Sequence, residues 1–299
     1  PVGPGTFDGT TDRTLFITPF VMDPNNPHIL LGGTYRVWRT TNQATSWTAI
    51  SGDLTGDGTG TEGGSISTLA VAKGNSDVIY IGCTNGRVQV TTNGGGSWNI
   101  RDNGLPTAYA TRIVVDPASE ATAYISYSGF AAGTKVYKTT DYGSTWTNIS
   151  GNLPNIPVNS LLVVPTRTEA VFAGTDLGVF TTTDGGTTWY RDGLSLPNVA
   201  IFDMDYRASD DKIFVHTHGR GTWSTPAAAT SIKEIGNNPV DFNLLQNYPN
   251  PFNPSTKIRF SVPYSGVVAV KVYDLQGKEI AILHNSSMNA GSYEVDWNG

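Results

Sequence analysis

The chain has 299 residues, of which 15% are charged, and it contains 34 glycines, 17 prolines and only 3 methionines. Its net charge of −6 argues against nucleic acid as a partner, because polyanion binding requires clustered lysine and arginine. The single cysteine, Cys83, excludes an internal disulfide, and no apolar run reaches the length of about 18 residues that a membrane span requires. Abundant Gly, Thr, Asn and aromatic residues favour strands and tight turns, so we expect an all-β protein.

The first predicted elements are pairs of apolar strands that recur along the chain. Each pair consists of an apolar strand, a turn, a second apolar strand and a Gly-Thr or similar dipeptide. Asp23-Pro24 and Asp116-Pro117 mark the same turn in two of the pairs. The five copies are Phe20–Thr34, Leu69–Thr84, Ile113–Tyr127, Leu161–Thr175 and Phe202–Thr217.

An eight-residue turn motif follows each of the first four strand pairs. It starts with Thr, has Asp or Asn at its third position and Gly at its fifth, and ends in Ser or Thr and then Trp; the first copy lacks the glycine. The copies are Thr40–Trp47, Thr91–Trp98, Thr139–Trp146 and Thr182–Trp189. The positions that define the motif are Asn42, Trp47, Asn93, Gly95, Trp98, Asp141, Gly143, Trp146, Asp184, Gly186 and Trp189.

The chemistry of this motif is that of a hairpin turn. An Asp or Asn side chain accepts hydrogen bonds from turn amides, and glycine supplies the positive φ that a tight turn needs. The tryptophan opens the next strand and buries a large ring between neighbouring sheets. We therefore interpret these residues as architecture rather than as an active site.

The repeats predict a β-propeller. Each unit supplies about four short strands in roughly 40–50 residues, which is the size of one blade, whereas a plain antiparallel sandwich would not repeat its turn and its tryptophan at this period. Residues 1–225 contain four full blades and a fifth that lacks its outermost strand. Residues 1–14 could supply that strand and close a five-bladed ring.

At these residues the chain resembles the Asp-box, or BNR-repeat, propellers, which include sialidases, sortilin-type receptors, photosystem II assembly factors and xyloglucanase-type glycoside hydrolases. The likeness covers roughly residues 15–225 and is greatest for the last group, through Ile50–Thr55, Gly174–Phe180 and His218–Gly221. Seven blades are commoner in this family, so the resemblance implies a larger ring with about two blades preceding Pro1. It is specific for fold and not for function.

The composition changes after Trp223. Residues 226–240 are typical of a linker, and residues 241–299 form a second predicted domain. Three prolines within Pro249–Pro254 predict a rigid entry loop rather than a helix or central strand. Strands are predicted at Lys257–Val262, Val267–Asp274, Lys278–His284 and Ser292–Trp297, with a hairpin turn at Leu275–Gly277.

The second domain resembles the C-terminal sorting domain of type IX secretion cargo, an Ig-like β-sandwich related to FlgD. The matching residues are Asn247–Pro254, Tyr273–Gly277 and the segment from Gly291 to Trp297-Asn298-Gly299. Family members continue past this last turn with further strands, so we expect the domain to be C-terminally incomplete here. The resemblance implies that the type IX secretion machinery is a partner, and that the protein is secreted or held on the outer cell surface of a bacterium.

Few residues stand out as candidates for chemistry. Asp53, Asp57 and Glu62 lie in a Gly-rich, oxygen-rich loop that could hold Ca²⁺, although we favour a flexible surface loop. His216 and His218 lie beside Arg220 near a strand end, where we favour hydrogen bonds at the closing strand over catalysis.

Other candidates belong to known types of sugar-binding site, but nothing in the sequence pairs them. A glycosidase needs two carboxylates across a cleft, and a sialidase needs an arginine cluster. The candidate carboxylates are Asp176, Asp205 and Asp210, and the candidate arginines are Arg36, Arg87, Arg112 and Arg220. Aromatic residues that could stack on sugars are Tyr35, Tyr109, Tyr127, Phe130 and Tyr142, each of which could equally be a core or rim residue.

Three functions fit this sequence. We favour an exported, non-catalytic propeller that binds a surface glycan or protein or takes part in an extracellular assembly, because abundant scaffold accompanies no catalytic constellation. The alternative is an extracellular glycoside hydrolase of the xyloglucanase type, with catalytic acids partly outside this chain. A self-assembling surface filament or layer is the third. None of them requires a cofactor.

Overall fold

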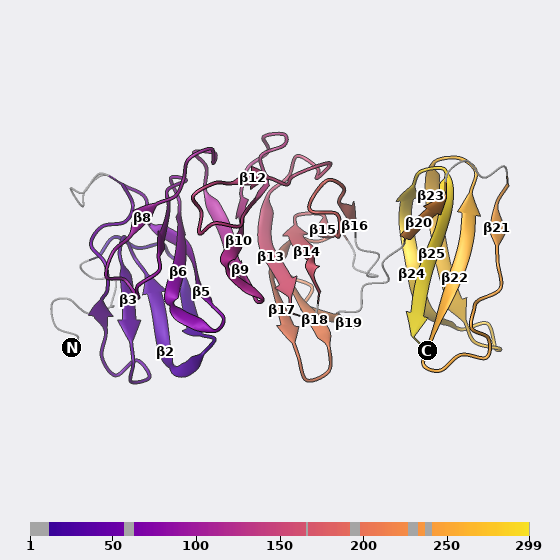
Figure 1. The fold of residues 1–299 in the computed structure, drawn as a ribbon, viewed down its shortest axis with the longest axis horizontal. Coiled ribbons are helices and arrows are strands. Elements are labelled where there is room, and N and C mark those ends of the chain that lie inside the picture. The colour runs from indigo at the N-terminus through magenta and orange to yellow at the C-terminus, as the bar shows by residue number, and fades with distance from the viewer. Residues whose placement is uncertain are drawn as a thin grey trace. The chain divides into compact units, whose positions relative to one another are not determined.

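The computed structural model describes residues 12–56, 63–165, 167–191, 198–226, 233–236 and 241–298. Every regular element in these ranges is a β-strand, which confirms the all-β prediction. No helix that could cross a membrane occurs in them. The chain divides into two compact units (Figure 1): residues 1–189, 198–205 and 215–222 form the first, and residues 190–197, 206–214 and 223–299 form the second.

Four successive antiparallel sheets have four strands each, hydrogen-bonded in chain order (Figure 1). The first two contain β1 (Phe20–Asp23), β2 (Asn26–Gly33), β3 (Val37–Thr40), β4 (Thr48–Ala49), β5 (Ile66–Ala72), β6 (Asn75–Cys83), β7 (Val88–Thr91) and β8 (Asn99–Ile100). The next two contain β9 (Ala110–Asp116), β10 (Ser119–Tyr127), β11 (Val136–Thr139), β12 (Thr147–Asn148), β13 (Val158–Val164), β14 (Arg167–Thr175), β15 (Gly178–Thr182) and β16 (Tyr190–Arg191).

A fifth sheet follows with three strands, β17 (Ile201–Arg207), β18 (Lys212–Thr217) and β19 (Thr222–Pro226). The segment that we expect to supply its missing strand is 1–14, and residues 1–11 lie outside the described ranges. Where that segment is described, Asp12 bonds to the first sheet: it accepts hydrogen bonds from Thr34 Oγ1 at 2.7 Å and Trp38 Nε1 at 2.8 Å. The number of blades in a complete ring therefore remains a prediction.

Apolar cores fill the spaces between successive sheets. Between the second and third sheets, Tyr80 and Val88 pack with Ile113, Ile125 and other buried residues. Because each sheet is covered on both faces, its second strand is almost continuously apolar: Val78 to Cys83 on β6 are all buried. Burial of Val78, Ile79 and Ile81 contributes about 1.5–3 kcal/mol each. Burial also raises the pKa of the Cys83 thiol to about 12, so this cysteine is a core residue.

The second unit contains two further sheets. One has the order β20-β25-β22-β21, and the other is the hairpin β23-β24. Phe260, Val262, Leu283, Tyr293 and Val295 are among the buried residues of its core. The strands are β20 (Lys233–Gly236), β21 (Asn243–Leu244), β22 (Ser255–Val262), β23 (Gly266–Tyr273), β24 (Glu279–Met288) and β25 (Gly291–Asn298).

One part of the predicted linker 226–240 is instead a strand. Residues 233–236 form β20, which pairs antiparallel with β25. Backbone pairing at a sheet edge requires no particular side-chain pattern, so composition alone did not indicate it. The turn predicted at Leu275–Gly277 is present, with Gly277 N donating to Asp274 O at 3.0 Å and a φ of 79° at Gly277. The boundaries of the two predicted domains remain predictions.

Candidate functional site

In the Asp/Asn turns, the polar side chains form hydrogen bonds within the turn itself. In the third sheet, Asp141 Oδ1 accepts hydrogen bonds from Thr139 Oγ1 at 2.8 Å and from the N–H of Thr145 at 2.9 Å. The backbone bond from Thr145 holds the pKa of Asp141 below its usual value. In the second sheet Asn93 accepts the same two bonds, from Thr91 Oγ1 and Ser97 N at 2.9 and 2.8 Å. A neutral amide therefore satisfies the turn as a carboxylate does.

The fifth position of each turn has a left-handed backbone. Gly143 has a φ of 78°, and its N–H donates to Thr139 Oγ1 at 2.9 Å. Ala44 occupies this position in the first turn with a φ of 66°, so the first copy adopts the turn without glycine. An alanine here is strained, because a Cβ at positive φ crowds the backbone.

The tryptophan that ends each turn ties its sheet to the preceding one. The indole Nε1 donates to a backbone carbonyl of the preceding sheet in three copies: Trp98 to Ile50 at 3.2 Å, Trp146 to Arg101 at 2.7 Å and Trp189 to Ile149 at 2.8 Å. Trp47, in the first sheet, lies instead with its ring 6.1 Å from that of Phe20. These bonds give the motif a structural role in the described blades.

The opposite end of the blades, which we call the crossover end, contains the loops by which the chain passes from one sheet to the next. Here side chains of the inner strands connect neighbouring sheets. Ser67 Oγ donates to Ala110 O at 2.6 Å, Thr111 Oγ1 donates to Val158 O at 2.5 Å, and Ser160 Oγ donates to Asp203 Oδ1 at 3.2 Å. Asp203 also forms an ion pair with Arg112. This network brings β9, β13 and β17 together at one end.

The Arg112–Asp203 pair is partly open to solvent. About a third of the Arg112 side chain is exposed (31%), and 43% of that of Asp203. Burial among the inner strands lowers the pKa of Arg112, and the nearby Asp205 carboxylate opposes that shift. Asp205 itself lies 3.1 Å from His216 Nε2, whose other ring nitrogen lies 3.0 Å from Thr222 Oγ1. His216 thus joins neighbouring strands, which is the role that we favour for it.

Large apolar side chains project from the same end of three sheets. Tyr109 is 39% exposed, Phe130 71%, Leu177 41% and Phe202 59%. Ser128 N donates to Tyr109 O at 3.0 Å, which joins the two loops that carry Tyr109 and Phe130. The ring of Phe202 lies 5.1 Å from that of His218. We call Tyr109, Phe130, Leu177 and Phe202, with Arg112 and Asp203, the crossover patch.

The structure does not bring the three candidate carboxylates together. Asp176 accepts a bond from Asn159 Nδ2 at 2.9 Å, Asp205 contacts His216, and Asp210 pairs with Arg207 Nη2 at 2.6 Å. Each carboxylate therefore has its own local partner.

The candidate arginines are similarly dispersed. Arg36 pairs with Asp12 at 2.7 Å and Arg87 with Asp102 at 3.1 Å, while Arg112 pairs with Asp203. Arg220 lies in the hairpin between β18 and β19. These pairs do not form the arginine cluster that a sialidase needs.

The candidate calcium loop is only partly described. Asp53 Oδ1 accepts bonds from Thr55 N at 2.8 Å and Thr55 Oγ1 at 2.7 Å, and its Oδ2 lies 3.4 Å from Arg13 Nη2. Asp57 and Glu62 fall outside the described residues, within which no cluster of three potential metal ligands occurs. Asp53 is thus engaged by its own turn and by a cation, and calcium binding remains a prediction.

Two of the candidate aromatic residues have structural surroundings. Tyr127 is fully buried against Tyr137, with ring centroids 5.9 Å apart, so it cannot stack on a ligand. Tyr35 lies beneath the guanidinium groups of Arg36 and Arg13, at 4.8 and 5.3 Å from its centroid. Tyr109 and Phe130 are the two that project into solvent at the crossover end.

Sequence reasoning did not find Asp203 or Ser160. They lie at equivalent points on two inner strands: Asp203 is the third residue of β17, and Ser160 the third of β13. The corresponding residues are Thr68 on β5 and Arg112 on β9. Aligning the repeats on their inner strands would have revealed this varied position at the crossover end.

Comparisons with known proteins show the fold. No family model matches the chain, and no curated protein matches it. Among solved structures, an ancestral GH74 enzyme aligns with a TM-score of 0.59 at 16% identity, over 94% of this chain and 39% of its own. The GH74 xyloglucanase from Xanthomonas campestris aligns with a TM-score of 0.58 at 14% identity, over 84% and 42%.

The extracellular domain of a hybrid two-component system from B. thetaiotaomicron aligns with a TM-score of 0.51 at 15% identity, over 88% of this chain and 34% of its own. The chain therefore spans about two fifths or less of these structures. At such identities the likeness shows architecture and not activity. With the successive sheets described above, it identifies the chain as one with a β-propeller fold.

Proposed function

We propose that this chain is part of an extracellular propeller protein that binds a glycan without cleaving it, at the crossover patch. The observation that carries the proposal is the exposure of Phe130 and Phe202 at the same end of the blades as the partly open Arg112–Asp203 ion pair. Sugars are bound by aromatic faces that take their C–H groups and by polar side chains held in place to take their hydroxyls.

The polar groups of the patch are already positioned. Asp203 is held by Arg112 and by Ser160, so its remaining lone pairs face a partly open surface without further reorganisation. The apolar residues come from three sheets, as expected for a surface that follows an extended ligand. Contiguous apolar groups bordered by polar residues are the usual mark of a binding surface.

The alternative is a glycoside hydrolase of the xyloglucanase type, and the likeness to GH74 folds favours it. Such an enzyme needs two carboxyl groups about 5–10 Å apart, one of them protonated. At the crossover end, Asp203 pairs with Arg112. The alternative places the catalytic acids partly outside this chain.

We also propose that the protein is exported, with residues 241–299 acting as a sorting domain for type IX secretion. Support comes from the matching motifs, from the two β-sheets of the second unit, and from the extracellular domain among the similar folds. Deleting residues 241–299 in the native host should retain the propeller inside the cell. Unchanged recovery of the truncated chain from the medium would contradict this role.

The glycan proposal is tested by retention on insoluble polysaccharides. The wild-type chain should be retained on at least one plant or bacterial polysaccharide, and the double variant Phe130→Ala/Phe202→Ala should bind about ten-fold more weakly, since stacked aromatic residues dominate such surfaces. Phe16→Ala is the control for loss of an exposed aromatic side chain, because Phe16 is fully exposed and is not one of the patch residues. Release of reducing sugar would establish the hydrolase instead, and retention unaffected by the double variant would overturn the proposed site.

A further inference from the structure

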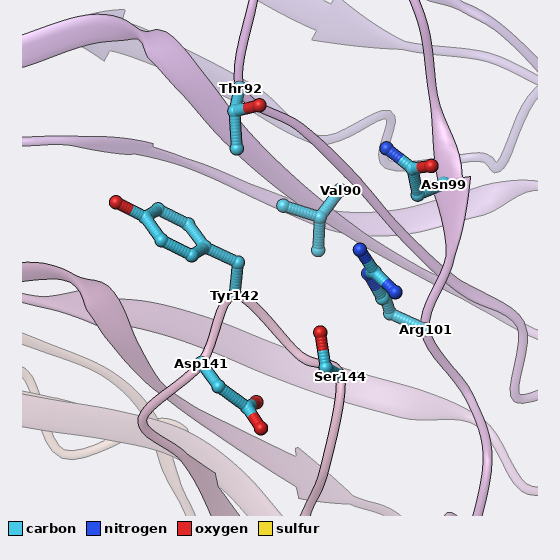
Figure 2. A pocket seen from close by; sticks show the side chains of 7 residues that line it. All are labelled: Val90, Thr92, Asn99, Arg101, Asp141, Tyr142 and Ser144. Atoms are coloured by element: carbon cyan, nitrogen blue, oxygen red, sulfur yellow. The ribbon is translucent and has the colours of Figure 1, made fainter.

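A groove lies between the second and third sheets, at the Asp/Asn-turn end. It has a volume of about 330 Å³, at the lower end of the range for small-molecule sites. Figure 2 shows polar side chains from both sheets around it, with Val90 between them. Its lining consists of Val90, Thr92, Asn99, Arg101, Asp141, Tyr142 and Ser144.

Arg101 occupies a position that is apolar at the neighbouring junctions. It is the residue whose carbonyl accepts the bond of the next sheet's tryptophan, a position held by Ile50 and Ile149 elsewhere. Those isoleucines lie directly beneath the turn glycines Gly95 and Gly186, as the Arg101 side chain lies beneath Gly143. A guanidinium therefore stands where the repeat otherwise places a hydrophobic contact.

A second difference between the junctions lies at Val90. Val90 precedes the first Thr of its turn, and the equivalent residue of the first sheet is Arg39. Arg39 reaches across its junction, with Nη1 3.4 Å from the carbonyl oxygen of Gly94 in the next turn. Val90 is too short to do so. The residue at this position differs in every sheet, with Lys138 and Thr181 in the third and fourth, so Arg101 is the departure from the repeat at this junction.

The guanidinium of Arg101 has a buried donor without an acceptor among the described residues. Its Nε is buried and makes no hydrogen bond within the described part of the chain. A buried donor without an acceptor costs about 1–3 kcal/mol, so such groups are rare unless a ligand or water completes them. In Figure 2 the Arg101 guanidinium points into the space that Ser144 and Asn99 also face.

The opposite wall is Tyr142, whose backbone is strained. Its φ is 57°. The equivalent residue of the first turn is Gln43, with a φ of 54°, and those of the second and fourth turns are Gly94 and Gly185. A left-handed tyrosine costs roughly 1 kcal/mol or more. The ring is fixed by a hydrogen bond from Tyr142 Oη to Glu120 Oε1 at 2.7 Å. The wall is therefore rigid before any ligand arrives.

We propose that this groove binds one pyranose residue of a glycan, as a second site distinct from the crossover patch. Arg101 and Asn99 donate to sugar oxygens, and Tyr142 contacts the C–H face. The ligand class rests on the proposed function, whereas the groove itself does not.

The test is a titration of the ¹⁵N-labelled full chain, observed at the Nε–H signal of Arg101. The probes are cellohexaose as a neutral glycan, hexagalacturonate as an acidic one, and inorganic phosphate. One or both glycans should shift that signal saturably. Arg101→Met lacks this signal, so its binding is measured by isothermal titration calorimetry beside the wild type; it should weaken about ten-fold, the loss expected for a charged hydrogen bond of about 1.4 kcal/mol. Arg39→Met, the equivalent arginine-to-methionine change at the preceding junction, should leave it unchanged.

Two further variants separate loss of binding at the groove from poor folding and from loss of the crossover patch. Tyr142→Gly restores the residue of the neighbouring turns and should weaken binding even if Arg101→Met folds poorly. Phe130→Ala/Phe202→Ala should leave the Arg101 shift intact, which separates failure of the groove from failure of the crossover patch. No shift with either glycan, or a shift with phosphate alone, would overturn the inference.

Discussion

Asn93 and Asp184 occupy equivalent positions at the Asp/Asn-turn end, and each accepts a hydrogen bond from the threonine two residues before it. Arg112 and Asp203 also occupy equivalent positions, at the crossover end, but one side chain is a cation and the other an anion. The first end repeats because each turn must satisfy its own amides. The crossover end varies because the first residues of each inner strand contact different residues of the adjacent sheets. Departures from the repeat are therefore where a ligand surface is to be sought.

The groove beside Arg101 is a departure from the repeat at the Asp/Asn-turn end. Two junctions there have isoleucine against the turn glycine, and the third has arginine. Among the described residues, the junction that departs from the repeat also has a groove, a left-handed tyrosine and an unpaired Nε.

The largest effect should come from removing a tryptophan at a junction. Trp189 is 3% exposed and donates to Ile149 O at 2.8 Å. Trp189→Ala should lower the free energy of unfolding by about 3–5 kcal/mol, through lost burial and the cavity left behind. Urea unfolding followed by circular dichroism measures it. Trp47→Ala, at the partly exposed first turn, should cost clearly less, and equal losses would refute the interpretation of Trp189 as a junction residue.

Replacing the turn carboxylates should change acid stability. Burial alone would raise the pKa of Asp184, but bonds from Thr188 N and Thr182 Oγ1 outweigh it, and the pKa of Asp141 is lowered too. Their contribution is present above an unfolded pKa of about 3.9 and is lost as pH falls through the lower folded value. Asp141→Asn/Asp184→Asn should therefore unfold like wild type at pH 7 and lose less stability below about pH 4.

Thermal melting from pH 7 down to about pH 2.5 measures this difference, over the range in which carboxyl groups protonate. Asp274→Asn, in the turn of the second unit, is a control for general loss of negative charge. Parallel melting curves for the wild type and the double variant would show that the two carboxylates do not govern acid unfolding.

Restoring the repeat at the groove should stabilise the chain. Arg101→Ile supplies the side chain that Ile50 and Ile149 provide and removes the unpaired Nε, so the free energy of unfolding should rise by about 1–2 kcal/mol. Chemical denaturation measures the gain. Arg39→Ile should give no comparable gain, and a destabilised Arg101→Ile would show that Arg101 supports the junction.

The smallest effect is expected for Tyr142→Gly. The change relieves a left-handed backbone but removes the bond to Glu120, so the net change in stability should be below about 1 kcal/mol. A loss above about 2 kcal/mol, measured by the same denaturation, would place Tyr142 in the core rather than in a binding wall.

The repeated parts of this molecule were accessible from sequence, and the pairings across repeats were not. A turn is predicted from the order of Thr139, Asp141 and Trp146 alone, because the hydrogen bond between the first two joins residues that are close in sequence. Arg112 and Asp203 meet because the inner strands β9, β13 and β17 come together at the crossover end, which no local pattern encodes. Arg101 was passed over because its position in the repeat is defined by the tryptophan of the following sheet.

The most direct test of the account is hydrogen–deuterium exchange of the full chain with and without a retained polysaccharide. We expect protection of peptides that cover residues 109–112, 128–135 and 198–203, with a weaker effect at 99–101 and 141–144. Protection confined to the turns at 42–46 and 184–188, or none at the crossover end, would contradict the claim that the ligand surface lies where the repeat is broken.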